Sequence, residues 1–294
     1  MANIYKQAYF NGKVGSIDDA NLSIASAAVL YGLSVYTVFY VYNHEDEHRP
    51  FKLRQHYDRL RSSAKIIGLE WPAKLTFEDF RQHVKDLIDA NKPTESVFVR
   101  ATLHADGLVP GTRTRGVSTQ LSIFVYTATP IVKPSGVRLK TSQWRRIPDN
   151  SIPSRAKVNG AYVNSVLAHQ DALDAGYDDC IFLDQSGHVC ELAAANIFMV
   201  RGGKLITPDT SSDLLEGINR RAILEMAAGA GIPVQERTVD LTELYIADEV
   251  FVCGTSAFVG SVAEIDGRHL EKNTPITQKI AALHAEALRS GDKL

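Results

Sequence analysis

The order of strand-like and helix-like segments is the feature that most constrains the fold of this chain. Short strands come in pairs, single helices separate the pairs, and no regular alternation of strand, helix and parallel strand runs through the sequence. This order predicts the α+β class rather than a doubly wound sheet. A chain of 294 residues is larger than one ordinary core requires, so we expect two domains.

Apolar periodicity and turn residues give the expected elements. Runs of β-branched and aromatic residues predict strands, of which the clearest are 34–42, 97–104, 120–127 and 249–253. Apolar residues at helical spacing predict helices over 23–31, 53–68, 77–90, 159–175 and 218–230. Turn residues predict hairpins at Asn11-Gly12, Gln185-Ser186-Gly187 and Gly202-Gly203.

One stretch separates the two halves of the chain. Residues 128–136 read ATPIVKPSG, with two prolines and no periodicity, which is typical of a linker. We therefore expect a small N-terminal domain over 1–127 and a larger C-terminal domain over 137–294.

Charge and cysteine content indicate the class of partner and the compartment. The 32 lysines and arginines nearly balance the 34 aspartates and glutamates, and no block of like charge suggests a nucleic-acid partner. Three cysteines without a CxxC pair are typical of reduced thiols. The N-terminus has no secretory signal and no apolar run reaches the roughly 20 residues of a membrane helix. We expect a cytoplasmic protein that acts on small molecules.

Several familiar motifs do not apply. Residues 44–48, HEDEH, match the HExxH zinc pattern, which requires a helix that places both imidazoles on one face. The segment instead follows a strand and is followed by Pro50, so we interpret it as a solvated hairpin turn and expect no metal. Neither a GxGxxG motif nor a Walker loop is present, which disfavours a dinucleotide or nucleoside-triphosphate enzyme.

A few residues could carry chemistry, although each alone would be ordinary. Lys157 precedes a predicted helix, Tyr162 lies one turn into that helix, and Glu191 follows a hairpin. Two segments could bind an anion through free backbone amides: the predicted helix start at 217–219 and the turn at 254–256. Without further context, Lys157 would be interpreted as a surface lysine.

Longer motifs give these residues a context. Residues 156–165, AKVNGAYVNS, resemble the lysine segment of class IV aminotransferases, and Glu191 stands thirty-four positions after Lys157. The similarity continues in order through 176–179, 187–191, 195–198, 205–208, 215–220, 247–251 and 254–257. Residues 56–60, HYDRL, resemble the phosphate-binding arginine segment of the same family.

The resemblance implies a two-domain fold type IV enzyme that uses pyridoxal 5'-phosphate (PLP), similar to the branched-chain aminotransferases. Lys157 would hold the cofactor as a Schiff base and move a proton to and from the substrate Cα. Glu191 would pair with the pyridinium nitrogen, Tyr162 with the phenolate oxygen, and Leu215 would pack on the ring. Arg59, Ile218, Asn219 and Thr255 would bind the phosphate. In this family the cofactor lies between the domains of a homodimer, and the neighbouring subunit completes the pocket.

The resemblance also implies the residues that contact substrate, which are Tyr31, Tyr36, Tyr40, Phe98, Arg100, Ser256 and Ala257. The chain departs from the branched-chain enzymes at three positions. Tyr40 replaces an arginine, Phe98 replaces the tyrosine of a Tyr-x-Arg motif, and Phe258 replaces an acid, whereas Arg100 is retained and could bind a carboxylate. An aromatic pocket of this kind suits leucine, isoleucine or larger amino acids.

We therefore expect a transaminase that moves an amino group from a hydrophobic or branched-chain L-amino acid to 2-oxoglutarate by a ping-pong mechanism. Alternatives of the same fold are a D-amino-acid or (R)-amine transaminase and an aminodeoxychorismate lyase. A non-catalytic PLP-binding protein is disfavoured, because Lys157 and Glu191 are both present.

Overall fold

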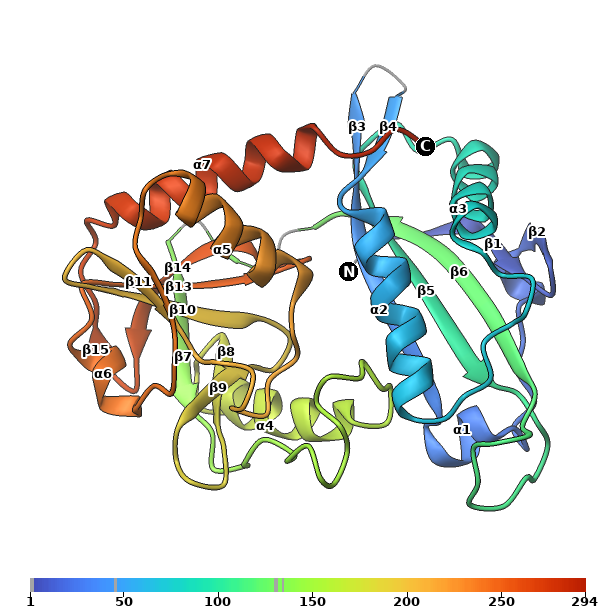
Figure 1. Ribbon diagram of the computed structural model, residues 1–294, viewed down its shortest axis with the longest axis horizontal. Coiled ribbons are helices and arrows are strands. Elements are labelled where there is room, and N and C mark those ends of the chain that lie inside the picture. The colour runs from blue at the N-terminus through green and yellow to red at the C-terminus, as the bar shows by residue number, and fades with distance from the viewer. Residues whose placement is uncertain (1–2, 45–46, 130–131, 134) are drawn as a thin grey trace. The chain divides into compact units, whose positions relative to one another are not determined.

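The computed structural model describes residues 3–44, 47–129, 132–133 and 135–294, which form two compact units (Figure 1). Unit 1 comprises Met1–Thr129, Ala156–Gly160 and Ala287–Leu294, and unit 2 comprises Pro130–Arg155 and Ala161–Glu286. The sequence predicted one C-terminal domain over 137–294, whereas two of its segments group with unit 1. Residues 130, 131 and 134 of the predicted linker lie outside the described residues.

The core of unit 1 is a six-stranded sheet in the order β2-β1-β6-β5-β3-β4, with antiparallel neighbours throughout. Its strands are β1 (Ile4–Phe10), β2 (Lys13–Ser16), β3 (Ser34–His44), β4 (Glu47–Pro50), β5 (Val97–Ala105) and β6 (Thr119–Thr127). Asn11 and Gly12 join β1 to β2 with φ angles of 52° and 77°, as a type I′ turn requires.

Helices cover one face of this sheet (Figure 1). They are α2 (Leu53–Ile66) and α3 (Phe77–Asn91), while η1 (Ile17–Asp19) and α1 (Ala27–Tyr31) are short. Phe39 of β3 contacts Phe80 of α3 and His56 of α2, at ring-centroid distances of 6.3 and 5.5 Å. Because side chains alternate along a strand, Tyr36, Val38 and Tyr40 point to the opposite face.

The core of unit 2 is a nine-stranded mixed sheet. Eight strands follow the order β12-β11-β10-β13-β14-β7-β8-β9, and β15 pairs with β14. The strands are β7 (Val137–Thr141), β8 (Asp179–Leu183), β9 (Val189–Leu192), β10 (Asn196–Arg201), β11 (Lys204–Thr207), β12 (Val234–Glu236), β13 (Glu249–Gly254), β14 (Phe258–Ile265) and β15 (Arg268–His269).

Helices complete one apolar core of unit 2. The helices that follow the linker are α4 (Tyr162–Asp174), α5 (Ile218–Gly229), α6 (Leu241–Tyr245) and α7 (Pro275–Arg289), and α5 and α7 contribute to this core. Ile223 of α5 and Ile280 of α7 pack with Phe198 and Phe251, whose rings stack at 5.0 Å. The buried carboxylate of Glu249 accepts hydrogen bonds from the backbone N–H groups of residues 276 and 277, at 3.0 and 2.7 Å. A negative charge there satisfies the N-terminal amides of α7 and fixes the start of that helix.

Most predicted elements are confirmed, with two corrections. Of the stretch 23–31, only Ala27–Tyr31 is α-helical, because the hydroxyl of Ser26 caps the helix at Val29 N–H. The helix predicted over 159–175 begins at Tyr162, so this tyrosine is its first residue and does not lie one turn inside it. The elements η1, β4, β7, β14, β15, α6 and α7 were not predicted.

The HEDEH segment is a hairpin where it is described, because His44 pairs with Glu47 across β3 and β4. Glu45 and Asp46 lie outside the described residues. Within the described ranges, no helix has both the length and the apolar character needed to cross a membrane.

Candidate active site

The segment that carries Lys157 is hydrogen-bonded along the start of β3 in unit 1. The N–H of Tyr36 donates to the carbonyl of Lys157 at 3.0 Å, and the N–H of Asn159 donates to the carbonyl of Ser34 at 2.8 Å. The N–H of Lys157 donates to the hydroxyl of Ser63 on α2 at 3.1 Å. These hydrogen bonds use the backbone of the segment, so they hold the backbone of Lys157 in place independently of its side-chain conformation.

Beside this segment, Gly32 and Gly160 approach each other so closely that Gly32 has no room for a side chain. A Cβ atom on Gly32 would lie 2.9 Å from the Cα of Gly160, and Gly32 has a φ of 64°. Gly160 in turn donates its N–H to the carbonyl of Gly32 at 3.1 Å. Only glycine combines this left-handed conformation with so close a contact.

The amine of Lys157 lies over an aromatic ring. Its Nζ is 4.9 Å from the ring centroid of Tyr36, and the side chain of Lys157 is half-buried. The face of an aromatic ring attracts a lysine side chain, so this contact narrows the positions that the amine can occupy. This geometry suits a lysine that acts as a nucleophile and a proton carrier.

Arg59 lies on the helix-covered face of the same sheet, in contact with a hydroxyl. Its Nη2 donates to Oγ1 of Thr37 at 3.3 Å, and the same Oγ1 lies 2.7 Å from Nδ1 of the buried His56. Burial, followed by the positive charges of Arg59 and Lys157, lowers the pKa of His56 well below its usual value. The imidazole is therefore neutral at neutral pH, and Arg59 carries the positive charge that an anion would meet.

The predicted substrate residues of β3 and β5 share the face of the sheet that α2 and α3 leave uncovered. Tyr40 lies opposite Phe98, and their rings meet edge to face at 5.9 Å. The guanidinium of Arg100 lies 3.7 Å from the ring centroid of Tyr36 and donates to Oδ1 of Asn159 at 3.1 Å. Among the described residues, no carboxylate forms an ion pair with Arg100. The face therefore combines aromatic walls with the guanidinium of Arg100.

In unit 2, Glu191 is buried and its carboxylate is held by three donors. Nη2 of Arg146 lies 2.9 Å from Oε1, while the amide of Asn196 and the backbone N–H of Leu215 each donate to Oε2 at 3.2 Å. Arg146 is itself mostly buried. A guanidinium this close favours the charged carboxylate, which can then accept a hydrogen bond from a protonated ring nitrogen.

The side chain of Asn196 also explains a glycine. Its amide donates to the carbonyl of Leu215 at 3.1 Å, and its Oδ1 would lie 2.1 Å from a Cβ atom built on Gly217. Gly217 is the N-cap of α5. The start of α5 and the support of Glu191 therefore depend on the same close contact.

The N-terminus of α5 and the β13–β14 hairpin supply donors for an anion. The first N–H groups of a helix have no acceptor within the helix, so Ile218 and Asn219 present amides at the positive end of its dipole. Nδ2 of Asn219 lies 3.4 Å from Oγ1 of Thr255, in the turn that joins β13 to β14. Such donors have the chemistry that a phosphate dianion requires.

The predicted site residues thus fall into two sets, and each set lies within one unit. Unit 1 holds Tyr31, Tyr36, Tyr40, Arg59, Phe98, Arg100 and Lys157. Unit 2 holds Tyr162, Glu191, Leu215, Ile218, Asn219, Thr255, Ser256, Ala257 and Phe258. Tyr31 is 48% exposed at the end of α1, and Phe258 opens β14 with a φ of 51°.

Sequence reasoning missed four residues that belong beside these sets. Arg146 and Asn196 hold Glu191, Tyr126 of β6 lies opposite Phe98, and His284 contacts Asn219. Asn196 lay inside a segment that had been matched to the family. Tyr126 could have been found from the alternation of β6, but Arg146 and His284 carry no local signal.

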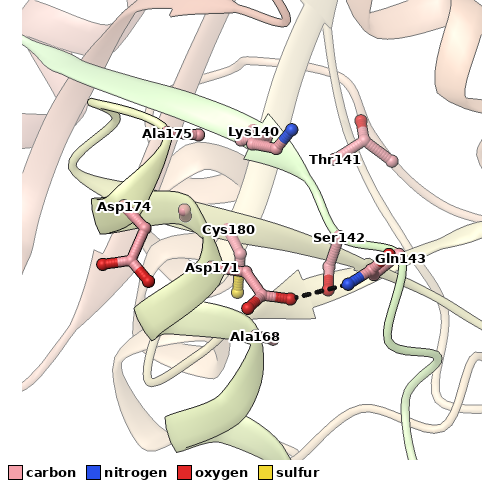
Figure 2. A pocket seen from close by; sticks show the side chains of 10 residues that line it. Lys140, Thr141, Ser142, Gln143, Ala168, Asp171, Asp174, Ala175 and Cys180 are labelled. Carbon is pink, nitrogen blue, oxygen red and sulfur yellow. Dashed lines mark hydrogen bonds between the residues drawn. The ribbon is translucent and has the colours of Figure 1, made fainter.

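A separate pocket of about 400 Å³ lies beside α4 in unit 2 and holds none of the predicted site residues (Figure 2). Two of its polar side chains bond each other, because Nε2 of Gln143 donates to Oδ2 of Asp171 at 2.9 Å. Among the described residues, no group of histidine, cysteine and acidic side chains has the arrangement of a metal site.

The chain is similar to known proteins over most of its length. Residues 34–265 match the family model described as amino-transferase class IV. The chain is 35% identical over 288 residues to a probable branched-chain-amino-acid aminotransferase of Aquifex aeolicus (strain VF5), with 96% of this chain and 92% of that protein covered.

Two solved structures have the same fold. The branched-chain aminotransferase of Thermoproteus uzoniensis, crystallised with norvaline, superposes with a TM-score of 0.94 at 33% identity and covers 98% of this chain and 96% of its own. The branched-chain amino acid aminotransferase of Thermobaculum terrenum, in its PLP form, gives a TM-score of 0.89 at 30% identity, with 98% and 95% covered. These matches confirm the α+β, two-domain fold that the sequence predicted.

Proposed function

The chain belongs to the class IV aminotransferases, and on that premise we propose that it is a PLP-dependent transaminase for hydrophobic or branched-chain L-amino acids, with 2-oxoglutarate as acceptor. The observation that carries the proposal is that the chain holds both a half-buried lysine, whose backbone is fixed by hydrogen bonds, and a buried glutamate, whose carboxylate pairs with an arginine. The homologous proteins are named for branched-chain amino acids, and one was crystallised with norvaline.

The residues of this chain fit the parts of the cofactor. When bound, PLP supplies an electron sink for the electrons of the broken Cα–H bond. Glu191 would accept the hydrogen bond of the ring N–H, and Tyr162 would contact the phenolate oxygen. Leu215 would pack on the ring. Arg59, Ile218, Asn219 and Thr255 would bind the phosphate. Lys157 would take the proton from Cα with its neutral amine, which requires that the amine be close and of limited mobility.

The substrate residues indicate how one site could accept two kinds of side chain. Tyr36, Tyr40 and Phe98 offer an apolar wall for the donor, while Arg100 offers a cation for the second carboxylate of 2-oxoglutarate. The backbone amides of Ser256 and Ala257 would hold the α-carboxylate common to both. Aromatic walls also suit amines that lack a carboxylate, which keeps an (R)-amine or D-amino-acid transaminase as the second candidate.

A donor and acceptor panel tests the proposed function. Purified protein incubated with L-leucine and 2-oxoglutarate should form glutamate, and D-alanine or (R)-1-phenylethylamine should react much more slowly. An aminodeoxychorismate lyase would release pyruvate from its substrate with no acceptor present. Faster turnover of the D-amino acid or the amine, or pyruvate release without acceptor, would reject the proposal in favour of the corresponding alternative.

We expect Arg100→Met to weaken the binding of 2-oxoglutarate, the acceptor that carries two carboxylates. Loss of a charge-assisted contact should raise KM for 2-oxoglutarate about 30-fold or more, with little change in KM for 4-methyl-2-oxopentanoate. Initial rates with each acceptor measure the effect, and Arg61→Met on the exposed side of α2 serves as the control. Equal losses with both acceptors would show that Arg100 does not distinguish them.

We also propose a homodimer, on the basis of an apolar patch in unit 1. Ile24, Val29, Leu30, Leu108 and Val109 are between 47% and 84% exposed. They lie on two adjacent segments, because the N–H of Ala27 donates to the carbonyl of Gly107 and that of Val109 to the carbonyl of Ala25, at 3.0 and 2.9 Å. A cluster of large apolar side chains on the surface supports a protein–protein contact.

The double variant Leu108→Asp/Val109→Asp is expected to be monomeric, because charges in an apolar interface lose their hydration without gaining a partner. Size-exclusion chromatography with light scattering measures the mass. Ile66→Asp, at an exposed position of α2, should stay dimeric. A monomeric wild type, or a double variant that stays dimeric, would contradict the proposed interface.

A cytoplasmic location remains a prediction. It is supported by Cys180, Cys190 and Cys253, all of which are buried free thiols.

A further inference from the structure

A buried histidine of unit 2 contacts the residues proposed to bind phosphate. His284 lies on α7 and is 1% exposed. Its Nε2 lies 2.7 Å from Oδ1 of Asn219, and Nδ2 of Asn219 donates to Oγ1 of Thr255 at 3.4 Å. No part of the proposed chemistry uses His284 directly, so its contact with this pair calls for a physical explanation.

The polarity of the asparagine amide gives the contacts a direction. Oδ1 of Asn219 can only accept a hydrogen bond, so Nε2 of His284 must carry the proton. The amide nitrogen of Asn219 then donates to the hydroxyl oxygen of Thr255. Because that hydroxyl accepts from Asn219 through a lone pair, its own proton is directed to another acceptor.

His284 acts as a neutral group in this arrangement. Burial lowers the pKa of His284 to about 4, so the imidazole carries one N–H and no charge at neutral pH. The residue is held in place because α7 packs through Ile280 into the core and is capped by Glu249. A rigid neutral donor can orient an amide without adding a charge to an anion site.

We propose that His284 is a positioning residue for the phosphate of the cofactor, because it orients Asn219 so that the Thr255 hydroxyl donates to a phosphate oxygen. The inference rests on the proposed function, since the phosphate is that of PLP. It assigns to α7 a role in cofactor affinity although this helix supplies none of the residues predicted to touch the cofactor.

Two ligands that differ only in the phosphate test the proposal. Apoprotein is titrated with PLP and with pyridoxal, and binding is followed by absorbance. His284→Leu is expected to raise the Kd for PLP about tenfold, because the hydroxyl loses its fixed direction toward a charged acceptor, and to leave the Kd for pyridoxal nearly unchanged. His284→Gln keeps an N–H at a similar reach, so its Kd for PLP should stay within about threefold of the wild type.

Two further measurements distinguish a positioning role of His284 from a purely structural one. In a Thr255→Val background, His284→Leu should add little to the loss of PLP affinity, because the two residues act as one unit. Equal weakening of PLP and pyridoxal, no weakening of either, or additive losses would overturn the proposal. Nitrogen-15 NMR of the wild type gives a check that needs no variant: a proton on Nε2 of His284 is expected, and an unprotonated Nε2 would overturn it.

The same titrations distinguish failure of the proposed function from failure of the proposed role of His284. A wild-type protein that binds no PLP would reject the function itself. If the wild type binds PLP but His284→Leu weakens the binding of PLP and of pyridoxal equally, only the role of His284 is rejected.

Discussion

Replacing Lys157 by alanine is expected to abolish transamination, with a loss in kcat of at least about 10⁴-fold. The substitution removes both the amine that binds the cofactor and the base that takes the proton from Cα. The fold should be little affected, because the hydrogen bonds of Lys157 with Tyr36 and Ser63 use its backbone atoms, although the contact of its amine with the Tyr36 ring is lost. Single-turnover kinetics with L-leucine and thermal unfolding measure the two properties separately.

A second lysine provides the matched control for this variant. Lys65 is exposed on α2 in the same unit, and Lys65→Ala should retain wild-type kinetics. If Lys157→Ala turned over at the wild-type rate, the assignment of the catalytic lysine would be wrong. A general loss of folded protein in both variants would instead indicate an effect of charge on unit 1.

Gly217→Ala is expected to have the largest effect on stability, a decrease of about 2–3 kcal/mol in the free energy of unfolding. The backbone of Gly217, with φ −63° and ψ 137°, is one that alanine adopts easily, so strain in the chain is not the cause. The cause is the added Cβ, which would lie 2.1 Å from Oδ1 of Asn196. Asn196 would have to move and would release Glu191 and the carbonyl of Leu215.

Gly229 on the same helix offers a control with the same change in composition. A Cβ on Gly229 meets nothing within 4 Å, so Gly229→Ala should be neutral or stabilise the protein by about 0.5–1 kcal/mol. Urea unfolding of both variants gives the two free energies. Equal stability of the two variants would show that the contact between Gly217 and Asn196 does not constrain the start of α5.

Local composition was enough to predict the central strands of unit 1. After Ser34, the run SVYTVFYVY in β3 is β-branched and aromatic throughout, and such side chains fit the surface of a pleated sheet. Asn11-Gly12 predicted its turn because few other residues adopt positive φ twice in succession. These features depend on neighbouring residues alone.

The signals for α7 and β14 were of different kinds. Helix α7 begins at Pro275 after Thr274, a typical start, and Ile276 and Ile280 follow at helical spacing, so a local helix signal is present although α7 was not predicted. Strand β14 begins with Phe258 at positive φ after a three-residue turn, and its sequence, FVGSVAEI, has no regular alternation of apolar and polar residues. Its identity as a strand comes from pairing with β13 and β7, which no local pattern encodes.

The residues of the candidate site also differ in whether the local sequence could predict them. Motif similarity assigned Lys157, Glu191 and Thr255, because these residues lie in continuous segments. Arg146 reaches Glu191 from forty-five positions earlier in the chain, and His284 reaches Asn219 across sixty-five. An ion pair or a hydrogen bond between distant segments depends on the fold, so the sequence alone could not predict the groups that hold the site residues in place.

The central claim is that the side-chain amine of Lys157 binds the cofactor covalently, and chemical trapping tests it most directly. Protein saturated with PLP is reduced with borohydride, digested and sequenced by mass spectrometry. We expect a phosphopyridoxyl group on the peptide that contains Lys157, in about one copy per chain. A label on a different lysine, or none on Lys157 while PLP is bound, would contradict it.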